Sequence, residues 1–482
     1  MYLSELFKNA PSINIEQLSC DSRVPMKDCI YFCVKGIKYN GHEFVDEAID
    51  NGANVIVYSD DIDISRNAIF IKVNNVDDVL NQVSSKFYDY PASKLETYIV
   101  GGTKGRSSVT SIINDLLKEI KKCCSIGVMG INDGDDLMLS NQATLTILDT
   151  QKCLDTFVKN DCKVCTLEAK TLALSYKKLD MINPNVFIYT TTSFESNDYK
   201  ELGLDFTDSL KRYLYTLDNN TICVLNRDDS TFLELYNAAG DKKVSYGKNI
   251  ESDYLISDIK YSNSSTSFNL THGTTFRINT SLLGEANVYN LTASLVALFE
   301  MGYDKETIIN SINNIERVDG VYDRLNFDDF NIIVDNASTS DSYKSILDYA
   351  KEITNDDNMI YTIISCNSSD SASKIKPIVE IADNNSDEII LTVDDTYEDN
   401  GQEILDTAAS FISKHNYLSI SDREGAIEEA IELLNSGDTL LILGKGNETF
   451  MYQGLVKKSY NGDKNVAYKY MNKRLKEENT LF

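Results

Sequence analysis

The sequence predicts an α/β fold with parallel, doubly wound sheets, and three observations support this prediction. Apolar segments with the length of buried strands alternate with helical segments along almost the whole chain. A glycine-rich turn leads from one of these strands into a helix. The length of 482 residues corresponds to about three domains. We expect these domains at residues 1–93, 94–317 and 318–482.

Each predicted domain contains its own set of strands. The first has short strands between polar turns, at Cys29–Val34, Ala53–Tyr58 and Ala68–Val73. The second begins at the strand Thr97–Val100, followed by the helix Val109–Lys121 and the strands Val164–Leu167, Val186–Thr190 and Thr221–Leu225. The third repeats the alternation, with strands at Phe330–Asp335, Met359–Ser365, Glu388–Val393 and Thr439–Leu443. The segment Val318–Gly320 is the expected hinge before the third domain.

Composition limits the partners. The chain has 46 basic and 74 acidic side chains, a formal net charge of −28, which repels nucleic-acid backbones and anionic membrane surfaces. We therefore expect no nucleic-acid partner. No apolar run reaches the ~18–20 residues of a spanning helix, so membrane insertion is not expected either. The three histidines restrict proton transfer near neutral pH.

The start of the chain and the cysteines predict a cytoplasmic protein. Met1–Asn14 lacks the apolar segment of a signal peptide. The ten cysteines are scattered and several lie in strand-like runs, which is typical of buried, reduced thiols. Cys162 and Cys165 have C-x-x-C spacing, but no second pair accompanies them to complete a zinc site.

The glycine-rich turn lies in Tyr98–Val109. A strand that enters such a turn and opens a helix directs backbone N–H groups, and the positive end of the helix dipole, at one point that suits phosphate. Ser107 supplies a hydroxyl for nucleotide-bound magnesium. The strict G-x-x-x-x-G-K-[ST] pattern is not met, because Arg106 stands in the place of lysine. A turn without a ligand and a nucleotide site are both compatible with this segment alone.

Motifs in family order over nearly the whole chain resemble those of the Mur ligases, most of all the type that adds the third residue to UDP-MurNAc-dipeptide. The amino-terminal resemblance covers Leu18–Arg23, Lys35–Phe44 and Ala48–Ala53. Gly102–Ser108 is similar to GTNGKTT, Leu167–Leu174 to MEVSSHAL, and Val224–Asp229 to VINADD. Gly284–Leu291 is similar to G-x-FNVYNAL, Ile333–Asp341 to VDYAHTPD, and Gly444–Glu448 to GKGHE.

The resemblance implies a three-domain Mur ligase architecture, with a P-loop-like central parallel sheet and a Rossmann-like carboxyl-terminal domain. It implies an ATP- and Mg²⁺-dependent ligase that joins an amino acid to a carboxylate of a UDP-linked cell-envelope precursor in peptidoglycan biosynthesis. ATP phosphorylates the carboxylate, and the incoming amine attacks the acyl phosphate. Another Mur ligase or an envelope-synthesis protein is a further candidate partner.

The resemblance also assigns residues to sites. ATP would be bound by Gly102, Thr103, Lys104, Gly105, Arg106, Ser107, Ser108, Asn290, Arg324 and Asp335. Ser107 and Glu168 would be magnesium ligands, and Glu168 and Lys211 catalytic residues, with Lys211 about where the family has a carbamylated lysine. The UDP-precursor would be bound by Ser22, Arg23, Asn40, Gly41, His42, Thr144 and Lys178. The amino-acid pocket would include Asp395, Gly444 and Glu448.

Most of these residues also have a purely structural interpretation. Glu168 is also compatible with a strand end, and Asp335 and Asn290 with caps or turns. Ser22 and Arg23 are compatible with a hydroxyl turn and a surface arginine, Lys211 with a solvated helix lysine, and His42 with a turn histidine. These alternatives remain open at the level of the sequence.

Several family positions hold other residues. Histidines of the family are replaced by Leu172, Ser196, Ser338 and Asn447. The threonine–proline motif reads Ala143-Thr-Leu145, and Tyr397 occupies the place of the arginine that grips diaminopimelate. Two hypotheses follow. The chain is a divergent amide ligase, or it is an inactive paralogue, a pseudoenzyme that binds a precursor or a partner protein.

Overall fold

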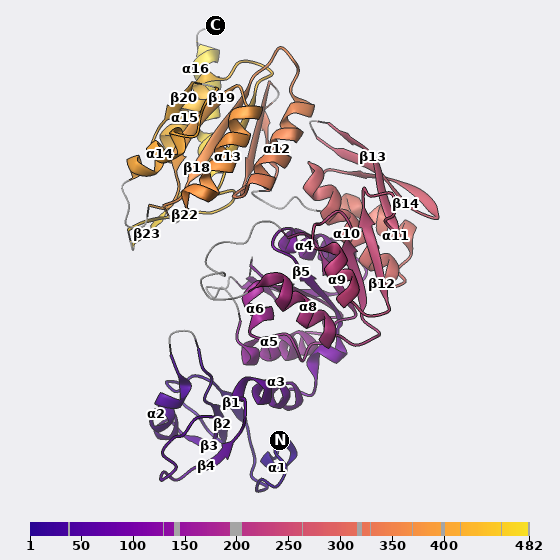
Figure 1. The fold of residues 1–482 in the computed structure, drawn as a ribbon, viewed down its shortest axis with the longest axis vertical. Coiled ribbons are helices and arrows are strands. Elements are labelled where there is room, and N and C mark those ends of the chain that lie inside the picture. The colour runs from indigo at the N-terminus through magenta and orange to yellow at the C-terminus, as the bar shows by residue number, and fades with distance from the viewer. Residues whose placement is uncertain are drawn as a thin grey trace. The chain divides into compact units, whose positions relative to one another are not determined.

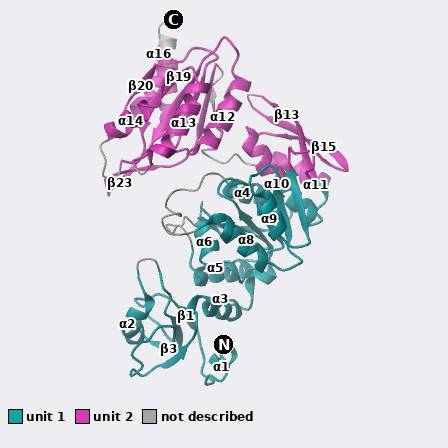
Figure 2. Cartoon of the chain, viewed as in Figure 1, with its two compact units in different colours: residues 1–246, 293–305 teal, residues 247–292, 306–482 magenta. Residues whose placement is uncertain are grey.

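The computed structural model describes residues 1–36, 39–128, 130–138, 145–192, 205–262, 264–315, 321–327, 329–368, 370–396, 401–414, 416–454 and 456–480. It divides into two compact units, shown in Figure 2. The first contains Met1–Tyr246 and Ala293–Lys305, and the second contains Gly247–Thr292 and Glu306–Phe482. The expected hinge Val318–Gly320 lies outside the described residues.

The first unit begins with a four-stranded parallel sheet in the order β1-β2-β3-β4. Its strands are β1 (Gln17–Ser19), β2 (Cys29–Phe32), β3 (Ala53–Tyr58) and β4 (Ile69–Lys72). The accompanying helices are α1 (Leu3–Leu6), η1 (Gly41–Phe44), α2 (Val45–Asp50), α3 (Val76–Phe87) and η2 (Pro91–Lys94). The three strands predicted for this region are confirmed.

The second sheet of this unit runs β12-β11-β10-β5-β9-β6-β7-β8 and is parallel from β12 to β6. The strands are β5 (Glu96–Gly101), β6 (Cys123–Gly127), β7 (Gly130–Asn132), β8 (Leu137–Met138), β9 (Val164–Ala169), β10 (Val186–Tyr189), β11 (Ile222–Asn226) and β12 (Lys243–Gly247). The helices are α4 (Arg106–Leu117), α5 (Ile147–Lys159), α6 (Thr171–Ser175), α8 (Phe206–Thr216) and α9 (Phe232–Ala238). The alternating pattern of strand and helix therefore predicted this sheet correctly.

The second unit contains an antiparallel sheet of β13 (Tyr254–Tyr261), β14 (Thr266–His272) and β15 (Thr274–Thr280). Helix α10 (Glu285–Glu300) contributes residues to both units, and α11 (Lys305–Asn310) and η3 (Ser311–Asn314) follow it.

The rest of the second unit is a six-stranded sheet in the order β16-β17-β21-β18-β19-β20, with helices on both faces (Figure 1). Its strands are β16 (Asp323–Phe327), β17 (Phe330–Asp335), β18 (Ile360–Cys366), β19 (Glu388–Val393), β20 (Tyr417–Ser419) and β21 (Thr439–Leu443). Its helices are α12 (Ser340–Ile353), α13 (Ala372–Asn385), α14 (Gly401–Ala409), α15 (Arg423–Leu433) and α16 (Asp463–Thr480), and β22 (Phe450–Gln453) and β23 (Val456–Ser459) form a hairpin.

Alternating side chains explain why this sheet is covered on both faces. In β21, Leu441 and Leu443 pack in the core formed with α12, α13 and α14, whereas Leu440 and Ile442 pack in the core formed with α15 and α16. A strand that buries both faces is apolar without interruption, as expected for a parallel sheet. The predicted doubly wound carboxyl-terminal sheet is confirmed.

Candidate functional site

The glycine-rich turn lies between β5 and α4, as predicted, and it is fixed to the end of β10. Thr103 N–H donates to Thr191 O at 2.8 Å, and the Thr190 hydroxyl donates to Lys104 O at 2.5 Å. Gly102 has φ +131°, and a Cβ there would lie 2.1 Å from Thr190 Oγ1. Only glycine fits this close approach, so the residue type and the loop conformation require each other.

Glu168 is brought to this loop by strand register. It pairs with Val100 in the neighbouring parallel strand, so its carboxylate lies near the edge where the loop begins. Ser107 Oγ donates to Glu168 Oε1 at 2.9 Å, and Val128 N–H donates to the same oxygen at 3.0 Å. Arg106 Nε lies 3.8 Å from Oε2, and the Glu168 side chain is 2% exposed. Within the described part of the chain, Oε2 accepts no hydrogen bond.

This arrangement fits a magnesium ion. A buried carboxylate oxygen without a hydrogen bond, beside a serine hydroxyl, offers the hard oxygen ligands that Mg²⁺ requires. The two magnesium ligands expected from the sequence, Ser107 and Glu168, are thus brought together. Lys104, Gly105 and Ser108 also lie in the loop or the first turn of α4, with Ser108 buried.

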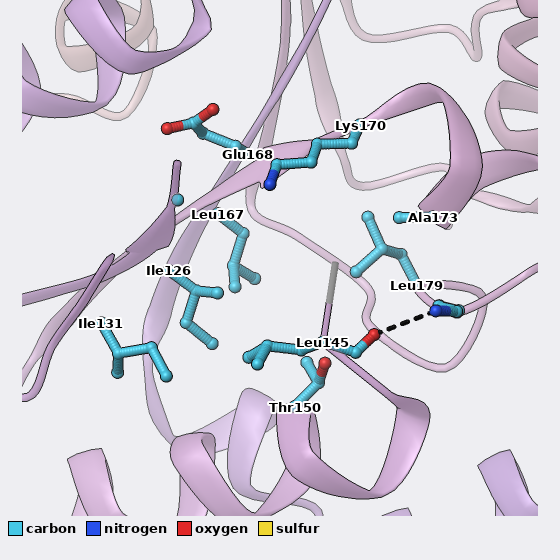
Figure 3. Close-up of a pocket in the computed structure, with 11 residues that line it drawn as sticks. Ile126, Ile131, Leu145, Thr150, Leu167, Glu168, Lys170, Ala173 and Leu179 are labelled. Carbon is cyan, nitrogen blue, oxygen red and sulfur yellow. Dashed lines mark hydrogen bonds between the residues drawn. The ribbon is translucent and has the colours of Figure 1, made fainter. Parts of the chain in front are cut away.

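A cavity lies beside Glu168 in the same unit (Figure 3). Apolar side chains such as Ile126, Leu167 and Leu179 form most of its wall. Its charged lining is Glu168, Lys170 and Lys178. Lys178 Nζ donates to Leu145 O at 3.2 Å, and burial lowers the pKa of Lys178. Lys178 therefore shares a cavity with Glu168. Thr144, which was also expected to bind the precursor, lies outside the described residues, as do Ser196 and Tyr397.

Lys211 is not among the residues that line this cavity. It lies on α8, with its Nζ 2.9 Å from Asp208 Oδ1 and 2.9 Å from Glu234 Oε2. These two carboxylates raise its pKa above the ordinary lysine value. Carbamate formation requires a neutral amine, so this environment disfavours the modification that the resemblance implied for Lys211.

The amino-terminal residues occupy two loops that follow β1 and β2. The Ser22 hydroxyl donates to Glu47, and Arg23 is exposed and paired with Asp21. His42 is buried, and its Nε2 accepts the N–H groups of Ser59 and Asp60.

Those two hydrogen bonds fix the tautomer of His42. The proton must be on Nδ1, which lies 2.7 Å from Asn40 Oδ1. Gly41 lies between these residues, and a Cβ there would come within 2.8 Å of Val34 O. His42 is therefore a buried part of this loop, with both ring nitrogens in hydrogen bonds.

In the second unit, Asp335 lies at the carboxyl end of β17 and accepts the Tyr322 N–H at 2.8 Å. Arg324 is on the neighbouring β16, but its Nη2 donates to Asn331 Oδ1 at 2.9 Å, near the start of β17. Asn290 lies within α10, so its interpretation as a capping residue is wrong; its Nδ2 is 3.4 Å from Asn287 Oδ1.

The residues predicted for the amino-acid pocket surround Lys445. The Nζ of this buried lysine lies 2.5 Å from Asp394, 3.4 Å from Asp395 and 3.0 Å from Glu448. Burial lowers the pKa of Lys445, but Asp394 and Glu448 raise it by more than burial lowers it. The net pKa lies above the ordinary lysine value, so the ammonium form is stabilised. Gly444, at φ +117°, donates its N–H to Asp335 O at 2.9 Å. Asp335 and Gly444 thus lie at the same edge of the sheet as the three acidic residues around Lys445.

Two features were missed at the level of the sequence. Lys170 lines the cavity, and its position directly after an apolar strand was the available signal. Arg423 and Asp463 form a buried ion pair at 2.7 Å, with side chains 1% and 0% exposed. They are 40 residues apart, and no local pattern connects them.

The state of the cysteines and the character of the helices can be read from the structure. All ten cysteines are free thiols, and Cys20, Cys123 and Cys153 are only partly buried. In the described part of the chain, none of the helices is long and apolar enough to cross a membrane, and no group of three or more His, Cys, Asp or Glu side chains could hold a metal ion.

Comparison with known proteins shows the family to which the chain belongs. Three family descriptions match successive regions: "Mur ligase family, catalytic domain" at residues 14–88, "Mur ligase middle domain" at 100–298, and "Mur ligase, glutamate ligase domain" at 317–446. The UDP-N-acetylmuramyl-tripeptide synthetase of Borreliella burgdorferi is 30% identical over 93% of this chain and 91% of its own. The chain belongs to the Mur ligase family.

Within this family the chain is similar to enzymes that form the tripeptide precursor. A UDP-N-acetylmuramoyl-L-alanyl-D-glutamate–2,6-diaminopimelate ligase of Clostridioides difficile is 27% identical, over 97% of each chain. A solved diaminopimelate ligase matches with a TM-score of 0.73 and 21% identity, over 98% of this chain and 99% of its own. MurF ligase from Thermotoga maritima, solved in complex with ADP, matches with a TM-score of 0.63 and 15% identity, over 96% of this chain and 98% of its own. At these identities, the two structures support the fold.

Proposed function

We propose that this chain is an ATP-dependent ligase that forms an amide bond between a UDP-linked MurNAc-peptide and an amino acid. The observation that carries the proposal is the loop between β5 and α4, with Ser107 donating to the buried carboxylate of Glu168. This is the combination that phosphoryl transfer requires: a backbone cradle, a hydroxyl and a buried metal ligand. The relatives that form the tripeptide precursor support the choice of substrate.

In this proposal, each part of the site has one task. The N–H groups at the start of α4 would bind phosphate oxygens, and Arg106 adds a fixed positive charge. Ser107 and Glu168 would hold magnesium, which supplies charge neutralisation during transfer of the phosphoryl group. Lys178 would orient the precursor beside Glu168. The precursor carboxylate would take the γ-phosphoryl group of ATP and release ADP. The amine of the amino acid would then attack the acyl phosphate, lose its proton and release phosphate.

We also propose the division into domains at residues 1–93, 94–317 and 318–482. The loops with Ser22, Arg23, Asn40, Gly41 and His42 would bind the UDP end of the precursor. They follow neighbouring parallel strands, so they emerge at one edge of the amino-terminal sheet. Asp395, Gly444 and Glu448 would lie in the amino-acid pocket, and Asn290, Arg324 and Asp335 would contribute to nucleotide binding.

A non-catalytic protein that binds the precursor or a partner protein is the second candidate. The observation in its favour is Lys211, whose raised pKa and two ion pairs disfavour a carbamate. If the protein is an active ligase, either another group takes the role of the carbamylated lysine or the reaction proceeds without such a group.

The test is release of ADP with UDP-MurNAc-L-Ala-D-Glu, ATP·Mg²⁺ and a panel of amino acids that includes diaminopimelate and lysine. We expect ADP release that depends on both the precursor and one amino acid, with the matching amide product in the mass spectrum. Glu168→Gln keeps the shape but removes the charge, and it should lower the rate by about 100-fold. Glu380→Gln, at an exposed ion pair on α13, is the matched control and should leave the rate unchanged. Precursor binding without ADP release for any amino acid would favour the non-catalytic candidate.

A further inference from the structure

The glycine-rich loop is bonded to a second segment, Thr190–Thr192, which continues from the end of β10 and which we call the β10 tail. The Thr190 N–H donates to Gly101 O at 3.0 Å, and its hydroxyl donates to the same oxygen at 3.1 Å. The N–H and the hydroxyl of Thr103 both donate to Thr191 O, at 2.8 and 3.2 Å. The position of the loop therefore depends on the position of the tail.

The β10 tail is held in turn by the carboxylate of Asp229, which lies in the turn between β11 and α9. Its Oδ2 accepts the Thr191 hydroxyl at 2.8 Å and the Thr192 N–H at 2.7 Å. Its Oδ1 accepts the Tyr189 hydroxyl at 2.7 Å, and it accepts the N–H and the hydroxyl of Thr231 at 2.9 and 2.7 Å. Hydrogen bonds to a carboxylate are stronger than those between neutral groups, so Asp229 is a firm anchor for the tail.

The neighbouring strands add two contacts to the end of β10. Asn226, at the end of β11, donates its Nδ2 hydrogen to Thr190 O at 2.7 Å, and the Tyr246 hydroxyl of β12 donates to Tyr189 O at 3.1 Å. Burial and the Asp229 carboxylate raise the pKa of Tyr189, so its phenol stays protonated and donates to Asp229. Side chains at the carboxyl ends of adjacent parallel strands thus converge on the segment that holds the loop.

From these contacts we propose that Asp229 is a positioning residue for nucleotide binding. It holds Thr191, and Thr191 holds the phosphate loop in the conformation that receives the triphosphate of ATP. This inference rests on the proposed function, because it assumes that the loop is a nucleotide site. A loop that is already fixed before ATP arrives loses little conformational freedom on binding, and this raises the affinity. Asp229 therefore acts on ATP through the protein chain.

Thr191→Val tests this link, because it removes the hydroxyl that donates to Asp229 and keeps the carbonyl that accepts from Thr103. In calorimetric titrations of the full chain, ATP binding should weaken by about fivefold to tenfold, whereas the affinity for UDP-MurNAc-L-Ala-D-Glu should change by less than about twofold. Hydrogen exchange without ATP should become faster at Thr103. Thr191→Ser keeps the hydroxyl and should restore both properties. Asp229→Ala removes the shared acceptor and should weaken ATP binding more than Thr191→Val.

The matched control is Thr221→Val. Thr221 is buried, and its hydroxyl donates to Pro184 O at 2.8 Å, just before the starts of β10 and β11 and thus at the opposite ends of these strands. This variant also loses one hydroxyl hydrogen bond, so the midpoint of urea unfolding should fall about as much as in Thr191→Val. Its ATP affinity and its exchange at Thr103 should equal those of the wild-type chain.

Equal ATP affinities for Thr191→Val and Thr221→Val would overturn this inference and leave the proposed ligase standing. Unchanged exchange at Thr103 in Thr191→Val would do the same, because the loop would then be fixed without the link to Asp229. No ATP binding by the wild-type chain would overturn the proposed ligase and this inference with it. If Asp229→Ala does not fold, the two Thr191 variants still decide.

Discussion

At the scale of single residues, His42 links the order of the amino-terminal loop to pH. Its Nε2 accepts two backbone N–H groups, and burial lowers its pKa below the ordinary value of 6.5. Protonation places a donor on that nitrogen and removes both hydrogen bonds. In the unfolded chain His42 binds its proton at higher pH than in the folded protein. The free energy of unfolding therefore falls as the pH drops below about 6.5.

We expect the thermal midpoint to decrease between about pH 7 and pH 5, with a contribution that disappears in His42→Gln. Scanning calorimetry at several pH values measures this. His272→Gln is the matched control, because His272 is exposed and lies on β14 in the other unit. If His42→Gln and the wild-type chain had parallel pH profiles, the protonation of His42 would not be coupled to folding.

Gly102 provides the second prediction at this scale. Alanine at φ +131°, with a Cβ 2.1 Å from Thr190 Oγ1, forces the loop or Thr190 to move. We expect Gly102→Ala to lower the free energy of unfolding by about 1–3 kcal/mol and to weaken ATP binding more than tenfold. Urea unfolding and ATP titration measure the two effects. Gly240→Ala, where the new Cβ meets nothing within 4 Å, should change neither. Unaltered ATP binding by Gly102→Ala would show that the loop conformation is not needed.

At the scale of the elements, the pair Arg423–Asp463 joins α15 and α16 to the sheet. Arg423 also donates to Ser365 Oγ at 2.5 Å and to Leu443 O at 3.1 Å, and Tyr460 donates to Asp463 at 2.7 Å. Burial lowers the pKa of Arg423, but Asp463 raises it more, so the arginine remains charged. The partners of Arg423 in this network all lie 20 or more residues away from it in the sequence.

We expect Arg423→Met to lower the free energy of unfolding by about 3–5 kcal/mol, because it leaves Asp463 buried without its counter-charge. The double variant Arg423→Met/Asp463→Leu should recover part of this loss, because no uncompensated charge remains. Chemical unfolding of the wild type, both single variants and the double variant measures the coupling. Additive effects would show that the two side chains do not act as a pair.

The difference between local sequence pattern and tertiary contacts explains which features could be predicted from the sequence. The strand Thr439–Leu443 and the turn at Gly102 depend on local chemistry: four apolar residues in a row after Thr439, and a glycine where no Cβ fits. Sequence pattern therefore predicted the sheets and the loop. Arg423, Asp463 and the contact between Ser107 and Glu168 depend on tertiary register, which local pattern does not contain. The resemblance supplied Glu168, but it gave no indication that Lys211 would pair with Asp208 and Glu234.

At the scale of the whole molecule, the chain forms two compact units, and the division into three domains stays a prediction. The first unit contains the amino-terminal sheet together with the strands from β5 to β12. Helix α5 provides a physical reason: Ile147 and Leu148 pack in the core of the amino-terminal sheet with Val55, Leu80 and Val83, whereas Leu154 and Phe157 of the same helix pack in the core of the second sheet. The boundary after residue 93 stays a prediction, but α5 packs in the cores of the sheets on both sides of this boundary.

This shared helix predicts that the two sheets of the first unit unfold together. We expect Leu148→Ser to lower the free energy of unfolding by about 2–5 kcal/mol, because it places a hydroxyl and a void in the amino-terminal core. Hydrogen exchange should then become faster in both β3 and β10, since α5 contributes to both cores. Leu233→Ser, at a leucine on α9 that is 70% exposed, is the matched control and should leave exchange unchanged. Faster exchange confined to β3 would mean that the amino-terminal sheet unfolds independently, and that residues 1–93 are a separate cooperative domain.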